Sequence, residues 1–347
     1  MKTKLFTLGL LTFAGAATAG QITVQNSEIT LNRAITTGYF YSNNTGSSNR
    51  DDFKVSNFLL GIGSDAKDGG IGFSTAIGTV LIPTVYDGGL TANKAILSKS
   101  FGVIYGYLTY KPISNMSLDT GLLPTNIGYE LATSFTNPNI TYGSVWSAQP
   151  FIYPGARFTY QIGDVKFYGE VSKDKGIVDG NHSLPTTGAY AIGSLGSFMG
   201  LDYAVSYYDY TAYKNLVDIV LSKELNPNLR LGLNFDYQWL DKSAKVSGKD
   251  DKGYGLALYI IPQFDNFSLP VRVEYINDGS KGRESGIYSS VSKAYTTTIT
   301  PTYRPTKYTY IRGELSYFKA DNLIFSDKNP NPKDSKTSAA VELGFLF

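Results

Sequence analysis

The segment from Leu229 to Trp239 alternates strictly between apolar and polar or small residues. Its odd-numbered positions carry Leu229, Leu231, Leu233, Phe235, Tyr237 and Trp239, and its even-numbered positions carry Arg230, Gly232, Asn234, Asp236 and Gln238. Successive side chains of an extended strand point to opposite faces, so this segment presents one aromatic, apolar face and one polar face. A strand of about ten residues with this pattern is typical of the wall of a transmembrane β-barrel, with lipid outside and water inside.

Similar segments recur along the chain and predict an all-β fold. We expect a transmembrane antiparallel up-and-down β-barrel of about 16 strands, with fourteen or eighteen left open, since such barrels need about 20 residues per strand and connection. The segments 116–124 and 187–195 show the weakest pattern, and 99–112 is too apolar on both sides for its faces to be assigned. The predicted strands are 32–42, 52–64, 70–83, 99–112, 116–124, 147–161, 164–173, 187–195, 199–211, 214–224, 228–240, 252–265, 267–277, 290–303, 306–319 and 337–347.

The connections between these segments alternate between short and long. Barrels of the outer membrane have short periplasmic turns and longer extracellular loops, so the alternation indicates a meander with both ends in the periplasm. The tight connection at Thr211-Ala212 falls on the long-loop side and is the exception. The short connections are Ser114-Asn115, Gly163, Gly196-Ser197-Phe198, Asn226-Pro227, Asn266 and Arg304-Pro305, and the long ones are 43–51, 84–98, 125–146, 174–186, 241–251, 278–289 and 320–336.

The last predicted strand ends on an aromatic residue. Apolar residues occupy every second position up to Phe345 and Phe347. Closing a barrel requires the last strand to pair with the first, which leaves no unpaired edge in lipid. We interpret Phe345 and Phe347 as an assembly signal for the barrel assembly machinery; filling the lipid face is the simpler reading, and the two are compatible.

The first residues resemble a secretory signal peptide. Lys2 and Lys4 precede a short apolar run, and Ala17-Thr18-Ala19 matches the small-x-small pattern of a cleavage site. We therefore expect residues 1–19 to be a signal peptide and residues 20–347 to form a single barrel domain. Without Lys2 and Lys4, the 31 basic residues become 29, equal to the 29 acidic residues. A neutral chain argues against a nucleic-acid partner, whose phosphates require a basic surface.

Composition excludes further classes. The chain has no cysteine, which rules out disulfides and thiolate metal sites. After the signal, no stretch approaches the 18 apolar residues of a transmembrane helix. Composition alone leaves a soluble β-sandwich or adhesin open, and the alternating pattern favours the membrane barrel.

The region from Tyr105 to Ile162 contains five segments of a recognisable pattern: Tyr107–Pro112, Leu118–Gly121, Gly128-Tyr129-Glu130, Thr136–Asn139 and Pro154–Arg157. Together they resemble the OmpL-like putative β-barrel porin family of Gram-negative bacteria. Gly38-Tyr39-Phe40 and Asn57–Gly61 support the resemblance, which covers about a third of the chain. It implies a pore in the outer membrane and no established solute or functional residue.

A barrel of this size is wide enough for an aqueous channel, and charges on its inner face would set the selectivity. Six bases and eight acids fall on the predicted inner face, which indicates weak selectivity, mildly for cations. Arg272/Glu274 and Arg312/Glu314 would either create a transverse field or neutralise each other in the wall. The predicted pore-lining residues are Lys54, Asp119, Arg157, Lys166, Glu170, Asp202, Asp218, Arg230, Asp236, Arg272, Glu274, Arg312, Glu314 and Glu342.

The longest connection, 125–146, is a second candidate element of the pore. We consider two alternatives: it folds into the barrel and narrows it, or it is an ordinary surface loop.

Aromatic residues near the strand ends fit two interfacial girdles better than a stacking path for sugars inside the lumen. These residues are Tyr39, Tyr110, Tyr160, Tyr210, Tyr237, Trp239, Tyr254, Tyr275, Tyr303 and Tyr317.

Enzyme chemistry is poorly supported by the sequence. The single histidine, His182, lies in the predicted loop 174–186 near Asp179 and Ser183, and a loop seldom holds catalytic geometry. Carboxylates cluster only at Asp51-Asp52 and Asp250-Asp251, so no metal or other cofactor is expected.

The sequence therefore predicts a bacterial outer-membrane porin for passive diffusion of ions and small hydrophilic solutes, without enzymatic activity. Its expected partners are outer-membrane lipids, the barrel assembly machinery and the solutes, and it would be a trimer or a monomer. A plugged or narrow barrel that serves as adhesin or structural anchor is the alternative, and a barrel hydrolase is the third.

Overall fold

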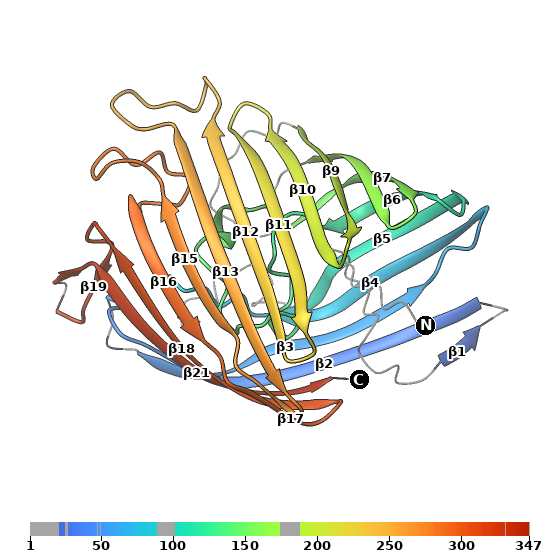
Figure 1. The fold of residues 1–347 in the computed structure, drawn as a ribbon, viewed down its shortest axis with the longest axis horizontal. Coiled ribbons are helices and arrows are strands. Elements are labelled where there is room, and N and C mark those ends of the chain that lie inside the picture. The colour runs from blue at the N-terminus through green and yellow to red at the C-terminus, as the bar shows by residue number, and fades with distance from the viewer. Residues whose placement is uncertain are drawn as a thin grey trace.

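The protein forms a closed antiparallel β-barrel, seen here in a computed structural model (Figure 1). The structure describes residues 21–24, 27–46, 48, 50–88, 101–173, 188–329 and 331–346. The predicted signal peptide and residues Asp179, His182, Ser183 and Phe347 lie outside this part of the chain. The described part of the chain contains no helix with the length and hydropathy of a membrane-spanning helix.

Sixteen strands make the wall when β14 with β15, and β16 with β17, are counted as one strand each. They are β2 (Ser27–Ser42), β3 (Asp51–Ser64), β4 (Gly70–Val80), β5 (Gly102–Ile113), β6 (Met116–Pro124), β7 (Ile152–Ile162), β8 (Val165–Lys173), β9 (Gly188–Phe198), β10 (Leu201–Tyr210), β11 (Lys214–Asn226), β12 (Leu229–Leu240), β13 (Lys252–Phe264), β14 (Phe267–Ser268), β15 (Val271–Asn277), β16 (Lys293–Ile299), β17 (Thr302–Thr306), β18 (Thr309–Ala320) and β21 (Ser335–Leu346). Three shorter strands lie outside this count: β1 (Gln21–Val24), which pairs with β2, and the hairpin of β19 (Phe325–Ser326) and β20 (Pro332–Lys333) in an outer loop.

Each wall strand pairs with its neighbours in the chain, and the last strand closes the ring. Strand β21 pairs with β2, from Ala34 with Leu346 to Ser42 with Ser338. This pairing leaves no free edge in the wall, as the absence of water in a bilayer requires. The predicted class and strand number are confirmed, and the less clear segments 116–124 and 187–195 correspond to β6 and β9.

Two of the predicted turns lie a few residues from their observed positions. Strand β9 includes Gly196, Ser197 and Phe198, so its turn is at Met199-Gly200. Arg304 and Pro305 belong to β17, and the turn follows at Lys307-Tyr308. Both strands extend beyond the point where their apolar pattern stops, so the pattern alone places these turns too early. Strand β7 likewise begins at Ile152 rather than at residue 147.

Two prolines interrupt the wall strands near the short turns. Pro270 separates β14 from β15, and Pro301 separates β16 from β17. Proline has no N–H to donate to the sheet ladder, so the regular pairing stops at both sites. The backbone N–H of Thr300 donates to the carbonyl of Pro270 at 2.9 Å, so the two interruptions adjoin each other.

The wall alternates as the sequence predicts. In β12, Asn234, Asp236 and Gln238 are buried inside the barrel, while Phe235 and Tyr237 between them face outward and are only partly covered. The outward face of other strands bears large exposed apolar residues such as Phe53, Ile192 and Leu315. This apolar outer surface is the band that contacts lipid in an outer-membrane barrel.

Aromatic residues gather on the outward face near the long-loop end of the strands. Tyr275 lies 5.9 Å from Tyr254 and 4.8 Å from Tyr295 between ring centroids, and Trp239 lies 5.7 Å from Tyr237. Strands β12 to β16 thus carry a band of aromatic residues on the outer surface, as in an interfacial girdle. Tyr210 differs from the expectation, because it shares the inward parity of the buried Tyr208 and its ring lies 4.3 Å from that ring.

Candidate functional site

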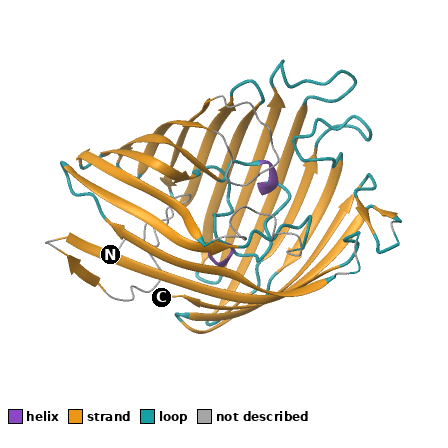
Figure 2. Ribbon diagram, turned by 180° about the vertical axis from the view of Figure 1, so that it is seen from behind, coloured by secondary structure: helices purple, strands orange, loops and turns teal. Residues whose placement is uncertain are grey.

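The connection between β6 and β7 runs through the inside of the barrel. We call residues 125–151 the inward segment; it includes the short helical turns η3 (Ser134–Thr136) and η4 (Trp146–Ala148), which lie within the ring of strands (Figure 2). Most of its side chains are buried, among them Phe135, Tyr142 and Trp146. The hypothesis that loop 125–146 folds into the barrel is therefore confirmed.

The structure places the charged residues predicted for the pore on the inner side of the wall, at positions that alternate with outward-facing residues. Six of these side chains hydrogen-bond to the inward segment: Asp218, Asp236, Arg272, Glu274, Arg312 and Glu314. Arg157 bonds to the residue just before the segment, and Glu170 and Glu342 pair with arginines of this set. Lys54, Asp119, Lys166, Asp202 and Arg230 belong to other parts of the inner face.

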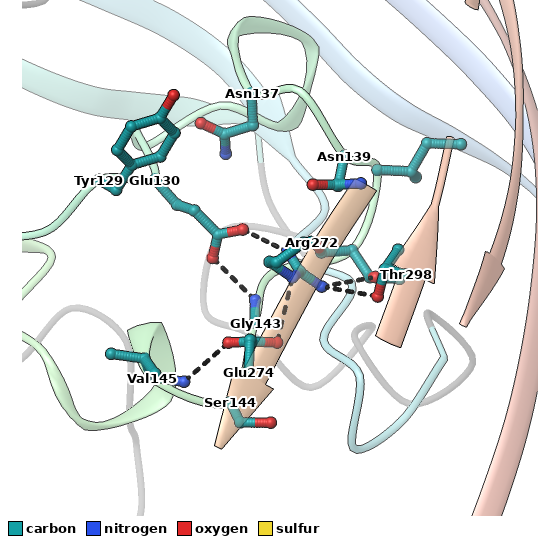
Figure 3. Close-up of polar contacts among 12 residues, drawn as sticks. Tyr129, Glu130, Asn137, Asn139, Gly143, Ser144, Val145, Arg272, Glu274 and Thr298 are labelled. Carbon is teal, nitrogen blue, oxygen red and sulfur yellow. Dashed lines mark hydrogen bonds and ion pairs between the residues drawn. The ribbon is translucent and has the colours of Figure 1, made fainter. Parts of the chain in front are cut away.

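The first anchor is a buried arginine between two carboxylates (Figure 3). Arg272 of β15 donates from Nη1 to the Glu130 carboxylate and, at 2.7 Å, to the carbonyl of Thr141, and its Nε lies 3.1 Å from Glu274. The Glu130 carboxylate also accepts the N–H of Gly143 at 2.7 Å. Burying charges is tolerated only where partners replace water, and here two carboxylates and a carbonyl surround the guanidinium.

A glycine permits this close approach. A Cβ added at Gly143 would collide with Oε1 of Glu274, so no larger residue fits without moving the backbone or the carboxylate. The same carboxylate accepts the N–H of Val145 at 3.1 Å. The inward segment thus presents its backbone directly to the carboxylates of β15 and of its own Glu130.

The second anchor is Glu314 of β18. Its carboxylate accepts the backbone N–H groups of Ile140 at 2.5 Å and Thr141 at 3.0 Å, and the hydroxyl of Thr300 at 2.8 Å. Hydrogen bonds to a charged acceptor are about twice as strong as neutral ones, so this carboxylate holds the segment firmly.

Arg312 forms the third anchor, together with Glu342 across the strand pair β18 and β21. Arg312 donates to Glu342 at 2.7 Å, and to the carbonyls of Ser134 and Asn137 at 3.1 Å each. The suggested pairing of Arg312 with Glu314 does not occur, because Glu342 lies directly opposite Arg312 in the register and Glu314 is engaged by the inward segment. Arg272 and Glu274 do pair, so these charges neutralise one another in the wall.

A fourth anchor joins the segment to β11 and β12. Asp218 and Asp236 lie opposite each other in the register. Asp218 accepts the N–H of Gly128 at 3.1 Å, and Asp236 accepts from Nε2 of Gln149 at 3.0 Å. Lys214 donates from Nζ to the carbonyl of Ala148 at 2.7 Å. Both ends of the segment are therefore tied to the same two strands.

The segment is also fixed where it leaves the wall. Arg157 of β7 donates from Nε to Glu170 at 2.7 Å and from Nη2 to the carbonyl of Pro124 at 2.6 Å. Apolar packing adds to these contacts: Phe135, Tyr142 and Trp146 pack with residues of β2 to β5, and Ile127 packs with residues of β8 to β11. The segment thus contacts the wall on several sides of the lumen.

A shorter segment joins it from the connection after β4. Val85 donates its N–H to the carbonyl of Tyr142 at 3.0 Å, and Tyr142 donates to the carbonyl of Pro83 at 2.7 Å. Lys336 of β21 donates to the carbonyl of Tyr86 at 2.6 Å. Residues 81–88 therefore add a second layer of residues to the inward segment, on the side of the long loops.

Spaces lie on both sides of these segments. An outer cavity of about 380 Å³ is lined by residues that include Tyr86, Phe325 and Lys336, near the long loops. An inner recess of about 160 Å³ is lined by residues that include Ser114, Asn115 and Gln161, near the short turns. The lumen thus consists of open spaces separated by a packed layer of polar and apolar side chains.

Sequence reasoning missed Glu130, Lys214 and Gln149. Glu130 lies in the predicted loop 125–146, which has no periodic pattern, and Gln149 falls within the predicted strand 147–161, although β7 begins only at Ile152. Neither side chain could therefore be assigned to its contact with the wall. Lys214 is the first residue of β11, so the alternating pattern can be followed only on its C-terminal side and does not establish which way Lys214 points. The one available signal is the density of Asn, Ser and Thr between residues 125 and 149, which suits a segment that bonds with a polar lumen.

The carboxylate clusters of the sequence have ordinary partners. Asp52 lies 3.7 Å from Lys54, and Asp250 lies 3.5 Å from Arg283. Within the described ranges, no group of three or more metal-ligating side chains is present.

Three comparisons with known proteins bear on the chain. A family model described as "Putative beta-barrel porin-2, OmpL-like" matches residues 12–347. No curated protein matches the chain. Among solved structures, outer-membrane expressed OmpT of Vibrio cholerae is similar with a TM-score of 0.64 at 8% identity, covering 94% of this chain and 100% of that one.

Two other porin structures show the same fold. A mutant of Rh. blastica porin has a TM-score of 0.54 at 17% identity, covering 92% of this chain and 100% of its own. A porin refined at 1.8 Å has a TM-score of 0.54 at 12% identity, with the same coverage of 92% and 100%. These identities are low, so the likeness concerns the fold.

Proposed function

The chain belongs to the OmpL-like β-barrel porin family and is a porin of the bacterial outer membrane, and we propose that ions and small hydrophilic solutes diffuse through it passively. The observation that supports this proposal best is the charged inner face of a closed barrel, on which the inward segment is held by Arg272, Glu314 and Arg312. The polar interior of a porin barrel is filled with water.

The inward segment determines how wide the path is. It is anchored to β11, β12, β15 and β18 and packs against the opposite wall, so any path beside it is narrow. We therefore propose a small conductance and an upper size limit near that of small metabolites. Because Arg157, Arg272 and Arg312 are each paired with a carboxylate, we also propose weak ion selectivity, with a mild preference for cations.

The experiment is single-channel recording of the purified protein in a planar lipid bilayer. We expect discrete steps of small conductance, and larger steps when residues 131–143 are replaced by a short Gly/Ser linker. Unchanged conductance in that variant would show that the segment does not limit the path. A barrel that folds but never conducts would contradict the diffusion proposal itself.

A plugged barrel is the second candidate function. Contact of the inward segment with several sides of the wall favours it, since such a layer closes a lumen if no water path passes it. In that case the outer loops would serve as an adhesin or structural anchor. A bilayer recording without conductance steps, together with binding of the protein to the surface of other cells, would support this candidate.

We further propose that the protein has no catalytic activity, that the barrel assembly machinery inserts it and that it is a trimer or a monomer. The family supports a channel rather than an enzyme. His182→Ala should leave unchanged any lipid or peptide hydrolysis detected in the preparation. The mass of the detergent-solubilised protein, from light scattering, decides between monomer and trimer.

A further inference from the structure

The inner recess is built from the wall strands β5 to β8 and the first residues of the inward segment. Its volume is about 160 Å³, and Asp119, Asn126, Arg157 and Lys166 are among the residues that line it. One bound water needs about 10–15 Å³ measured in this way, so the recess has room for on the order of ten water-sized positions. A solute slightly larger than glycine therefore fits into this volume.

The recess contains charges of both signs that form no ion pair with each other, although Asp119 lies opposite Arg157 in the strand register. In the described part of the chain, the ammonium group of Lys166 makes no hydrogen bond and no ion pair. The Asp119 carboxylate accepts the hydroxyl of Thr109 at 2.7 Å and forms no ion pair with any described residue. The two groups share one cavity without direct contact, which leaves space for a ligand between them. Arg272 and Arg312 differ, because carboxylates already pair with both.

Asn126 supplies an independent indication of a ligand. This side chain is only 5% exposed, and no described residue donates to its Oδ1. A buried acceptor without a partner costs about 1–3 kcal/mol, which a donor on a bound solute would recover. Asn126 lines the recess, so the unsatisfied oxygen and the unpaired charges belong to one site.

Arg157 adds a second donor at the same place. Its Nε and Nη2 are engaged by Glu170 and by the carbonyl of Pro124. No hydrogen bond to a described residue uses its Nη1, and the residue lines the recess. The site therefore offers a cationic side, formed by Lys166 and Arg157, and an acceptor side, formed by Asp119 and Asn126.

We propose that the inner recess binds small zwitterionic solutes, with the ligand carboxylate on Lys166 and Arg157 and its ammonium group on Asp119 and Asn126. A free α-amino acid has both charges within a few atoms, as this arrangement requires. A neutral polyol leaves both charges of the site unpaired, and a simple anion leaves the acceptor side unsatisfied. The inference rests on the proposed diffusion of small solutes through the barrel, because the recess would then be a binding site along their path.

Binding is measured without any need for conduction. The probe is L-alanine, titrated against the full-length mature protein in detergent micelles and followed by saturation-transfer difference NMR. Lactate, which lacks the ammonium group, and alaninol, which lacks the carboxylate, are the matched ligands, with glycerol as the neutral one. We expect saturable binding of alanine and at least tenfold weaker binding of the other three.

Two conservative variants test the residues. Lys166→Gln and Asp119→Asn should each weaken alanine binding about tenfold, which corresponds to about 1.4 kcal/mol. Lys54→Gln changes another inward lysine that does not line the recess and should bind as the parent does. A heat-dependent shift in gel mobility verifies that each variant is folded.

The outcomes separate this inference from the proposed function. Equal binding of alanine and lactate, or full binding by both recess variants, would overturn the zwitterion site. Alanine binding by a barrel that does not conduct would support the recess while contradicting diffusion. Conduction without alanine binding would support diffusion and contradict the binding site in the recess.

Discussion

Arg272 on strand β15 donates a hydrogen bond to the carboxylate of Glu130, a residue 142 positions earlier in the chain and part of the inward segment (Figure 3). Both side chains are buried, at 0% and 2% exposure. The guanidinium of Arg272 and the carboxylate of Glu130 are therefore both removed from water. Each charge is stabilised by the other in place of water. The same guanidinium also lies beside Glu274, so the loss of one group affects two carboxylates.

Removing Arg272 alone should destabilise the protein strongly. Arg272→Met leaves Glu130 and Glu274 buried without a cation, and breaking a buried pair in this way costs about 3–5 kcal/mol. Adding Glu130→Gln and Glu274→Gln removes the orphaned charges and should restore most of the loss. Urea unfolding in lipid vesicles measures the free energy, and a triple variant as unstable as the single one would contradict the pairing.

Glu314 should control how firmly the inward segment is held. Glu314→Gln replaces a charged acceptor of two backbone N–H groups, Ile140 and Thr141, with a neutral one. Charged hydrogen bonds contribute about 1.5–3 kcal/mol each, so we expect faster amide exchange at both residues and noisier channel currents. Hydrogen-exchange mass spectrometry over residues 125–151 provides the measurement. Asp202→Asn, an inward change away from this anchor, serves as control and should leave the exchange unaltered.

The assignment of the lipid-facing surface can be tested by placing an arginine at two different depths in the membrane. Phe235 lies outward near the middle of β12, and Trp239 lies outward near its end at the long loops. An arginine at the bilayer centre costs about 2–4 kcal/mol and near the interface about 0–1. Phe235→Arg should therefore reduce the free energy of unfolding in vesicles much more than Trp239→Arg. Equal effects would mean that β12 does not cross the membrane in the expected manner.

The outer loop after β15 should become less ordered as the pH rises. Burial raises the pKa of Asp278 from 3.8 to about 6, although this carboxyl accepts hydrogen bonds from Ser285 and from the N–H groups of Gly286 and Tyr288. The folded loop therefore holds the proton more tightly than the unfolded one, so the contribution of this group to stability is greatest below pH 4 and falls as the pH rises to about 6.

Hydrogen exchange of residues 278–292, corrected for the intrinsic pH dependence of exchange, measures this effect. Protection should decrease between pH 4 and pH 7 in the parent protein. Asp278→Asn removes the titrating group and should give protection that is independent of pH over this range. A parent loop with constant protection would contradict the raised pKa.

The C-terminal aromatic residues should affect assembly more than stability. Phe345 lies on the outward face of β21, while Phe347 lies outside the described residues. Phe347→Ala should lower the amount of folded protein in the outer membrane several-fold, whereas its refolding in detergent should be nearly unchanged. Heat-dependent gel mobility of membrane fractions reports the folded amount. Val341→Ala, an outward change within the same strand, is the matched control.

Most of the wall could be predicted from the sequence because its physics is local. A bilayer imposes one alternation on every strand, and Leu229–Trp239 shows it in full. Where the period breaks, the faces of a strand could not be assigned. This holds for the segment 99–112, because β5 contains a bulge at its pairing with β4, which turns both Ile104 and Tyr105 inward. In β3 a similar irregularity turns both Ser56 and Asn57 inward.

The sequence by itself determined the fold class, the order of the strands, a strand number of about 16 and, for most strands, which side chains face the lumen, because each of these follows from neighbours in the chain. Only the tertiary structure decided which inner charges meet. Arg312 pairs with Glu342 rather than Glu314, and Glu130 pairs with Arg272, because barrel closure and the path of the inward segment bring together residues that no local pattern connects. Long-range electrostatic partners depend on positions in space, and alternation along a strand specifies only the side to which each residue points.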